Sequence, residues 1–359
     1  MTRRVAVIGG GITGLAAAYE AQRADANAAV TVYEATDRFG GKVHTTAFAG
    51  HLVDHGADAF LARVPWGLEL CRELGIDTTL VSPAQQSAYV WFRGALRRLP
   101  TGLVLGVPTD FDAVRASGIV DEPITPRPSR AALAPDEDVS VGALVRSQLG
   151  DAVFERLVDP LLGGINAGDA DHLSLRAGAP QLAAAAERDA DLVAALRAQP
   201  PALPGPVFYS PVGGMGVLVD ALVDRTTALG VDLRRGSPIG RISEVDADEI
   251  VLTTPAHVAA SQLADDAPTA AARLADIEYA SVTLVTLAFP ASARTAPLDA
   301  SGFLVPRTEG LLMTATSWSS SKWAHLGDTD TAIVRVSTGR YGDERHAGVA
   351  CRSREIRIE

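Results

Sequence analysis

Residues 4–14 read Arg-Val-Ala-Val-Ile-Gly-Gly-Gly-Ile-Thr-Gly, and this stretch decides the fold. Its first five residues are mostly apolar and branched, which is typical of a strand buried in a parallel sheet. The strand ends at a Gly-x-Gly-x-x-Gly turn, and the residues that follow have helical character. In such a turn Gly9 permits the tight bend, Gly11 lets a pyrophosphate approach the backbone, and Gly14 allows close packing of helix on strand. Phosphates then lie at the helix N-terminus.

A second strand is predicted at residues 29–33, and it ends at Glu34. An acid about twenty residues beyond the last glycine of such a turn binds the ribose hydroxyls of a dinucleotide. A carboxylate at this place also repels a 2′-phosphate, which disfavours NADP. Strand, turn, helix, strand and acid in this order predict a dinucleotide-binding site.

The net charge and the cysteines exclude several other classes of function. The 32 Lys and Arg against 43 Asp and Glu leave a net charge of −11, which disfavours a nucleic-acid partner. Cys71 and Cys351 form no Cys-x-x-Cys pair, so neither a disulfide scaffold nor a metal site is expected. No apolar run has the 18 or so residues of a membrane span. A signal peptide is disfavoured by the glycines in the N-terminal apolar run, so we expect a cytoplasmic protein.

The segment after Glu34 indicates which dinucleotide is bound. Residues 34–42, Glu-Ala-Thr-Asp-Arg-Phe-Gly-Gly-Lys, resemble the Glu-x-x-x-Arg-x-Gly-Gly-Lys signature of the FAD-dependent amine oxidase superfamily. The paired glycines allow the backbone to pass close to a diphosphate, and Arg38 and Lys42 can neutralise it. Residues 54–60, Asp-His-Gly-Ala-Asp-Ala-Phe, resemble the segment that lies along the flavin in this superfamily. The resemblance implies FAD as the cofactor.

Further stretches narrow the resemblance to the bacterial protoporphyrinogen and coproporphyrinogen oxidases. Residues 160–168, Pro-Leu-Leu-Gly-Gly-Ile-Asn-Ala-Gly, are similar to that branch's Pro-Leu-x-x-Gly-Ile-Tyr-Ala-Gly run, with Asn166 in place of an aromatic residue. The resemblance also implies that the backbone of Ile239, in a strand expected at 239–242, meets the adenine. The cofactor-binding residues assigned by motif and by resemblance are Gly9, Gly10, Gly11, Ile12, Thr13, Gly14, Glu34, Ala35, Arg38, Gly40, Gly41, Lys42, Gly56, Ala57, Asp58, Ala59 and Ile239.

The resemblance implies an activity in haem biosynthesis. The reaction would be the oxidation of coproporphyrinogen III, or of protoporphyrinogen IX, to the porphyrin by molecular oxygen with release of hydrogen peroxide. No apolar membrane-binding patch stands out, which favours the coproporphyrinogen branch. No catalytic residue is assigned, because the cofactor carries the chemistry. The carboxylates of the tetrapyrrole call for arginines, and the candidates are Arg93, Arg97, Arg98 and Arg176.

Two alternatives stay open at this point. The first is that the chain is another amine oxidase or a carotenoid desaturase, which would share the motifs of the first 60 residues. The second is that it is an inactive, truncated FAD-binding remnant, because the family's last flavin-contacting unit has no counterpart in these 359 residues.

The resemblance implies an α/β fold in which a Rossmann-like FAD-binding domain with a parallel sheet is interleaved with an α+β substrate domain and a helical subdomain. The FAD-binding domain is expected at 1–88 and 206–260. The helical substrate or cap subdomain is expected at 89–205 and the substrate-domain sheet at 261–345. Residues 346–359 match nothing in the family and are expected to be a tail outside it.

Overall fold

The computed structural model describes residues 2–200, 205–294, 296–327, 330–343 and 345, and this part of the chain forms two compact units. Each unit is built from two separate stretches of sequence. Unit 1 contains 1–83 and 205–278, and unit 2 contains 84–204 and 279–359. Unit 1 thus continues beyond the boundary at 260 expected from the sequence, because helices α11 (Ala256–Leu263) and α12 (Pro268–Ala275) pack against each other within it. The expected tail at 346–359 lies outside the described residues.

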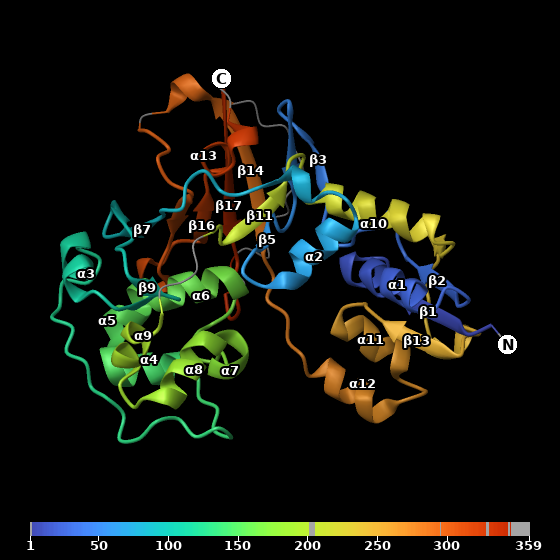
Figure 1. Cartoon of the computed structure of the whole chain (residues 1–359). Coiled ribbons are helices and arrows are strands. Elements are labelled where there is room, and N and C mark those ends of the chain that lie inside the picture. Colours follow the sequence, from blue (N-terminus) through green and yellow to red (C-terminus); the bar gives the residue numbers. More distant parts are fainter. Residues whose placement is uncertain (1, 201–204, 295, 328–329, 344, 346–359) are drawn as a thin grey trace. The chain divides into compact units, whose positions relative to one another are not determined.

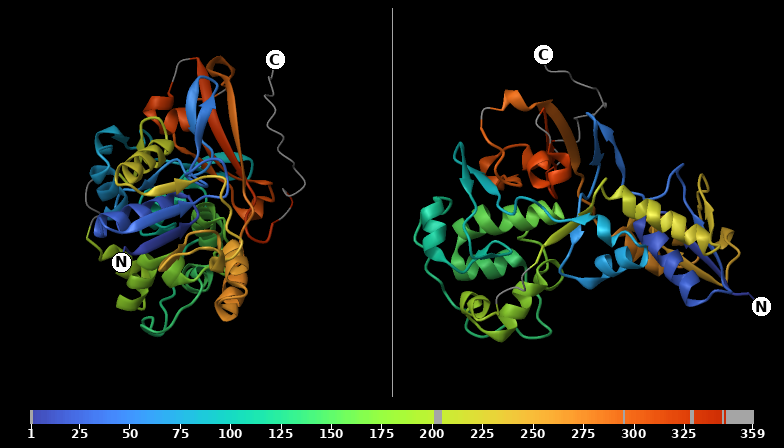
Figure 2. Two further views of the ribbon diagram at one scale, coloured as in Figure 1. Left: turned by 90° about the vertical axis from the view of Figure 1, so that its right-hand side faces the viewer. Right: turned by 45° about the horizontal axis from the view of Figure 1, so that its top comes forward.

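Unit 1 is centred on a parallel sheet with the strand order β12-β2-β1-β13 (Figure 1). The inner strand β1 is buried from Val5 to Ile8, in keeping with its uninterrupted apolar sequence. Helices α1 (Ile12–Ala24) and α10 (Gly216–Ala228) lie side by side (Figure 2). Leu15 of α1 and Leu222 of α10 belong to the same buried apolar cluster. The expected parallel sheet is therefore confirmed. Its strands are β1 (Arg4–Ile8), β2 (Ala29–Tyr33), β12 (Asp232–Arg234) and β13 (Glu249–Leu252).

The remaining elements of unit 1 surround this sheet. The helices are α1 (Ile12–Ala24), α2 (Pro65–Glu73), η1 (Asp77–Thr79), α10 (Gly216–Ala228), η3 (Ile242–Glu244), α11 (Ala256–Leu263) and α12 (Pro268–Ala275). The strands are the hairpin of β3 (Thr45–Phe48) with β4 (His51–Asp54), and the small sheet of β5 (Phe60–Leu61), β11 (Phe208–Pro211) and β6 (Leu80–Val81).

The strand predicted at 239–242 is wrong. Ile239 lies in an irregular segment, and a short 3-10 helix begins at Ile242. The chain turns at Gly236 with a φ of 61°, and Pro238 has no backbone N–H to donate to a neighbouring strand. An apolar run placed directly after such a turn cannot join the sheet edge.

Unit 2 contains a six-stranded sheet with the order β14-β17-β16-β15-β7-β8. All neighbouring pairs are antiparallel except β15 with β7. Its strands are β7 (Tyr89–Phe92), β8 (Ala95–Arg98), β14 (Thr283–Pro290), β15 (Gly302–Leu304), β16 (Met313–Ser317) and β17 (Thr331–Thr338), with β9 (Leu103–Val104) and β10 (Val107–Pro108) as a separate pair.

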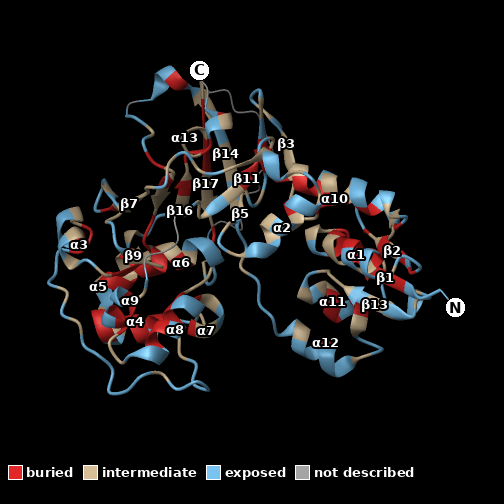
Figure 3. Ribbon diagram, in the orientation of Figure 1, coloured by how far each residue is buried: buried red, intermediate tan, exposed pale blue. Residues whose placement is uncertain are grey.

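The helices of unit 2 form its largest apolar core, which is visible as the buried stretches of α4 and α8 in Figure 3. Ser140 is the N-cap of α4, and its Oγ accepts from the N–H of Ala143 at 3.0 Å. The helices are α3 (Phe111–Ser117), α4 (Val141–Leu149), α5 (Asp151–Val153), the π-helix η2 (Phe154–Val158), α6 (Asp159–Asn166), α7 (Leu175–Gly178), α8 (Pro180–Arg188), α9 (Leu192–Arg197), η4 (Ala291–Ala293), η5 (Arg307–Glu309), α13 (Ser319–Lys322) and η6 (Ala324–Leu326).

Candidate cofactor-binding site

The glycine-rich turn between β1 and α1 is held in place by backbone contacts. Gly9 adopts a φ of 108°, which strongly favours glycine, and its N–H donates to the carbonyl of Tyr33 at 2.8 Å. The Thr253 hydroxyl, just after β13, donates to the Gly9 carbonyl at 2.8 Å. A Cβ on Gly14 would lie 1.8 Å from the same carbonyl oxygen. Gly9 and Gly14 are therefore required by the packing of the turn itself.

Gly11 differs from these two glycines, because the protein leaves open space around it. A Cβ at this position would meet only the Cα of Gly41, at 3.9 Å, which is an ordinary contact. As the N-cap of α1, Gly11 also supplies no side chain to the first N–H groups of the helix. Unpaired N–H groups at a helix N-terminus, with open space in front of them, suit a phosphate. The residues present fit the pyrophosphate of a dinucleotide.

Glu34 ends β2 beside this turn, and its buried carboxylate accepts three hydrogen bonds. Oε2 accepts from the N–H of Gly10 at 2.8 Å, and Oε1 accepts from the N–H and the hydroxyl of Thr36 at 2.8 and 2.7 Å. Burial raises the pKa of this carboxyl, but the bonds from Thr36 and Gly10 outweigh burial and hold it below the usual value. An ionised carboxylate has about four acceptor positions, so one remains for a ribose hydroxyl.

The Gly40-Gly41 loop passes directly over the turn. Gly40 and Gly41 have φ values of 99° and 58°, and the N–H of Gly40 donates to the carbonyl of Gly10 at 2.8 Å. Arg38 donates from Nη2 to the carbonyl of Gly41 at 2.7 Å, so part of its guanidinium holds the loop. The carbonyl of Lys42 would lie 2.7 Å from a Cβ on Gly56, which explains the glycine there.

The segment predicted to lie along the flavin begins with an acid that caps a helix. Asp54 accepts from the N–H of Met215 at 2.9 Å and from the Thr45 hydroxyl at 2.5 Å, and that hydroxyl accepts from the N–H of Gly216 at 2.8 Å. Both acceptors satisfy the first N–H groups of α10. The remaining candidates of this segment, Ala57, Asp58 and Ala59, lie in the irregular stretch between β4 and β5.

Ile239 is held by a glutamine that the sequence did not indicate. The buried Gln262 of α11 donates from Nε2 to the carbonyl of Ile239 at 2.9 Å and accepts from the Thr254 hydroxyl at 2.9 Å. Within the described residues, the N–H of Ile239 has no acceptor. The residues Gln262, Thr36 and Thr253 help to build the site but were not predicted from the sequence. The pair Thr253-Thr254 at the carboxyl end of β13 was the available signal, since ligands bind at that end of parallel strands.

The four candidate substrate arginines all lie in unit 2, and the structure does not bring them together. Arg93, Arg97 and Arg98 belong to the β7–β8 hairpin, whereas Arg176 belongs to α7. Three of them are already neutralised by carboxylates: Arg93 by Asp121 at 2.6 Å, Arg98 by Asp299 at 2.7 Å, and Arg176 by Glu187. The buried Nε of Arg97 has no acceptor within the described part of the chain.

No helix among the described residues is both long and apolar enough to cross a bilayer. The same residues also contain no group of three or more His, Cys, Asp or Glu side chains placed to hold a metal ion.

Comparison with known proteins relates the chain to flavoproteins. The model of the family described as flavin-containing amine oxidoreductase matches residues 12–358. The coproporphyrinogen III oxidase of Mycobacterium bovis is 37% identical over 360 residues, which cover 95% of this chain and 78% of that protein. The coproporphyrinogen III oxidase of Bacillus subtilis is 29% identical, and the alignment again covers 95% of this chain and 78% of that protein.

A solved structure extends this likeness to the fold. A crystal structure of an Exiguobacterium protein, described as a protoporphyrinogen oxidase candidate, has a TM-score of 0.83 and is 30% identical to this chain. The likeness covers 96% of this chain and 78% of that one.

Proposed function

The chain belongs to the flavin-containing amine oxidoreductase family, and on that premise we propose that it oxidises coproporphyrinogen III to coproporphyrin III with FAD as cofactor, in haem biosynthesis. The observation that carries the choice of substrate is the 37% identity, over 95% of the chain, to a protein named coproporphyrinogen III oxidase. A cytoplasmic location is part of the same proposal.

The residues of unit 1 would hold the FAD. Bound there, FAD supplies the acceptor for hydride from the porphyrinogen and passes the electrons to molecular oxygen, with hydrogen peroxide as second product. The first N–H groups of α1 and the open space at Gly11 suit the pyrophosphate. Glu34 would accept a hydrogen bond from a ribose hydroxyl, and the N–H of Ile239 would be available to the adenine. The chain's own part in catalysis is to bind, orient and exclude water.

The test is to mix the purified, FAD-loaded chain with coproporphyrinogen III under air and to follow porphyrin fluorescence. We expect coproporphyrin to appear well above the spontaneous rate, with hydrogen peroxide released alongside it. Protoporphyrinogen IX, assayed in parallel, tests the second substrate of the same class. An FAD-loaded chain that never exceeds the spontaneous rate with either substrate refutes the proposal.

The two alternatives predict different results in these experiments. An amine oxidase or a carotenoid desaturase would bind FAD, and it would leave the porphyrinogen at its spontaneous rate. An inactive remnant would be purified without FAD and would gain none at micromolar concentration. Absorbance near 450 nm, compared before and after adding FAD and removing the excess, separates these outcomes.

A further inference from the structure

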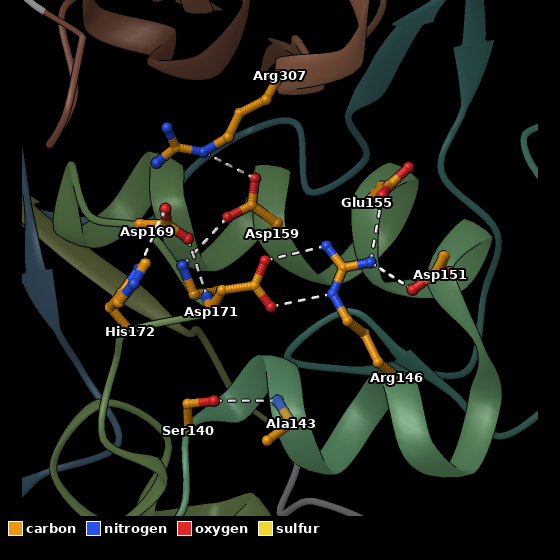
Figure 4. A network of polar contacts seen from close by, with 11 residues as sticks. Ser140, Ala143, Arg146, Asp151, Glu155, Asp159, Asp169, Asp171, His172 and Arg307 are labelled. Atoms are coloured by element: carbon orange, nitrogen blue, oxygen red, sulfur yellow. Dashed lines mark hydrogen bonds and ion pairs between the residues drawn. The ribbon is translucent and has the colours of Figure 1, made fainter.

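A buried acid at the start of α6 forms an ion pair with Arg307. The carboxylate of Asp159 is 4% exposed, and its Oδ2 lies 3.2 Å from the Nε of Arg307 (Figure 4). Its Oδ1 accepts from the N–H of Ala170 at 3.2 Å. Arg307 also donates to the carbonyls of Gly168 and Tyr341, so it ties the loop after α6 to the segment after β17. Burial of the carboxyl group raises the pKa of Asp159 even so, and this effect outweighs the opposing effects of the Ala170 N–H and Arg307.

A second guanidinium, that of Arg340, is near enough to the same pair for both of its members to act on it electrostatically. Burial and then the neighbouring Arg307 lower the pKa of Arg340, while Asp159 and Asp343 act in the opposite direction. Asp343 is already held by both Nε and Nη2 of Arg345, at 2.8 and 2.6 Å. Within the described residues the Arg340 guanidinium makes no hydrogen bond or ion pair, and its Nε is buried without an acceptor.

Within the described part of the chain, these charges leave Arg340 without a carboxylate of its own. The carboxylates that act on Arg340 there are Asp159, which pairs with Arg307, and Asp343, which pairs with Arg345. The nearby Asp169 is engaged by His172, whose Nδ1 lies 3.3 Å away, and by the N–H of Asp171. A partly buried guanidinium without a partner is costly, and an incoming carboxylate or phosphate would remove that cost.

Exposed apolar side chains occur on the segments that meet around Arg340. Ile165, near the end of α6, is 65% exposed, and Tyr341 is 38% exposed. Tyr341 is fixed next to α6 because its N–H donates to the carbonyl of Ala167 at 2.7 Å. Leu311 is 42% exposed, and its carbonyl accepts from Arg345. A cation beside exposed large apolar groups fits an amphiphilic organic anion better than it fits free phosphate.

We propose that Arg340, supported by Arg307, binds one carboxylate of the tetrapyrrole, with Ile165 and Tyr341 against its apolar ring. This inference rests on the proposed function, since coproporphyrinogen III is an apolar macrocycle that carries four propionates. It replaces three of the four arginines chosen from the sequence, Arg93, Arg98 and Arg176, since each is neutralised by a protein carboxylate.

The test uses the FAD-loaded full chain and coproporphyrin III, the fluorescent product. Replacing one charge-assisted hydrogen-bonding partner by a neutral one, Arg340→Gln, should raise the Kd of coproporphyrin III about tenfold or more. Arg340→Lys keeps the charge and should lose less. Tyr341→Ser should also weaken binding, through lost apolar contact. Arg115→Gln is the matched control, because Arg115 is an exposed arginine of the same unit that pairs with Asp112.

The outcomes separate this inference from the proposed function. If Arg340→Gln binds coproporphyrin III as tightly as the wild type, with unchanged FAD content and circular dichroism, the inference is overturned. An equal loss in Arg115→Gln would overturn it too, since the effect would then reflect net charge alone. A wild type that does not oxidise coproporphyrinogen III refutes the proposed function instead. Should Arg340→Gln fail to fold, Arg340→Lys and Tyr341→Ser decide the question.

Discussion

Replacing Gly11 by alanine should leave the fold of the unliganded chain intact and still prevent FAD from binding. The backbone of Gly11, with φ −69° and ψ 177°, is open to any residue. The added methyl would meet its nearest protein atom at 3.9 Å. Alanine in place of glycine gains about 0.4–1 kcal/mol from the unfolded state, and the poorer N-cap offsets roughly the same amount. The free energy of unfolding should therefore change by less than about 1 kcal/mol.

The loss in FAD affinity can be worked from the same geometry. The methyl group would occupy the open space in front of the first N–H groups of α1, where the pyrophosphate is expected. Two charge-assisted hydrogen bonds, at about 1.5 kcal/mol each, would then be lost or stretched. The sum of about 3 kcal/mol corresponds to a Kd roughly 100-fold higher.

Gly14→Ala is the matched comparison, because its methyl group would strike the protein instead. The new Cβ would lie 1.8 Å from the carbonyl oxygen of Gly9 and 2.7 Å from the Thr253 hydroxyl. Such overpacking costs about 1–3 kcal/mol, and a backbone contact this short belongs at the upper end. We expect the unfolding midpoint to fall by roughly 6–12 °C without any cofactor present.

The assay combines thermal unfolding of the unliganded variants with titration by FAD, followed through flavin fluorescence. Gly11→Ala should separate the two readouts, because it should unfold at the wild-type temperature and bind FAD weakly. Gly14→Ala should unfold at a lower temperature and also bind FAD weakly. A Gly11→Ala variant that binds FAD within threefold of the wild type would show that the space beside Gly11 does not hold the pyrophosphate.

Three further predictions concern single side chains of unit 1. The folded state lowers the pKa of Glu34, so the stability that its carboxylate contributes is complete above the unfolded-state pKa and is lost as pH falls through the folded-state pKa. The thermal unfolding temperature should therefore decrease as the pH is lowered past about 4.5, and it should decrease less steeply in Glu34→Gln. Asp54→Ala removes the cap of α10 and should cost about 1–2 kcal/mol in urea unfolding, and an unchanged midpoint would contradict the capping role. Burial raises the pKa of the Cys71 thiol to about 11, so in a Cys351→Ser background a thiol reagent at pH 8 should label Cys71 only after unfolding.

The turn at the start of the chain was predictable because its information is local. The glycines of residues 9–14 follow directly on a strand, and the turn conformation depends on neighbours within a few positions. The strand at 29–33 was confirmed for the same reason, since its apolar run is short and ends at a polar residue. At 239–242 a similar apolar pattern predicted a strand that does not form, because the preceding Gly236 and Pro238 set the direction of the chain.

The partners of charged and polar side chains could not be predicted. Gln262 reaches Ile239 only because α11 folds back over the segment before β13, and nothing in the sequence near either residue specifies that contact. The arginines show the same limit. Arg98 and Arg340 are equivalent as sequence letters, but Arg98 is neutralised by Asp299, whereas no carboxylate among the described residues pairs with Arg340.

The backbone N–H of Thr253 donates to the carbonyl of Ile8 at 2.9 Å, across 245 positions of sequence, because β13 pairs directly with β1. A ribosome that adds about 5–20 residues per second needs roughly 10–50 s to make the chain between them. During that time β1 and its glycine turn emerge without the strand that completes one side of their sheet. The nucleotide site can therefore form only late in synthesis, and until then the apolar edge of β1 is a target for chaperones and for aggregation.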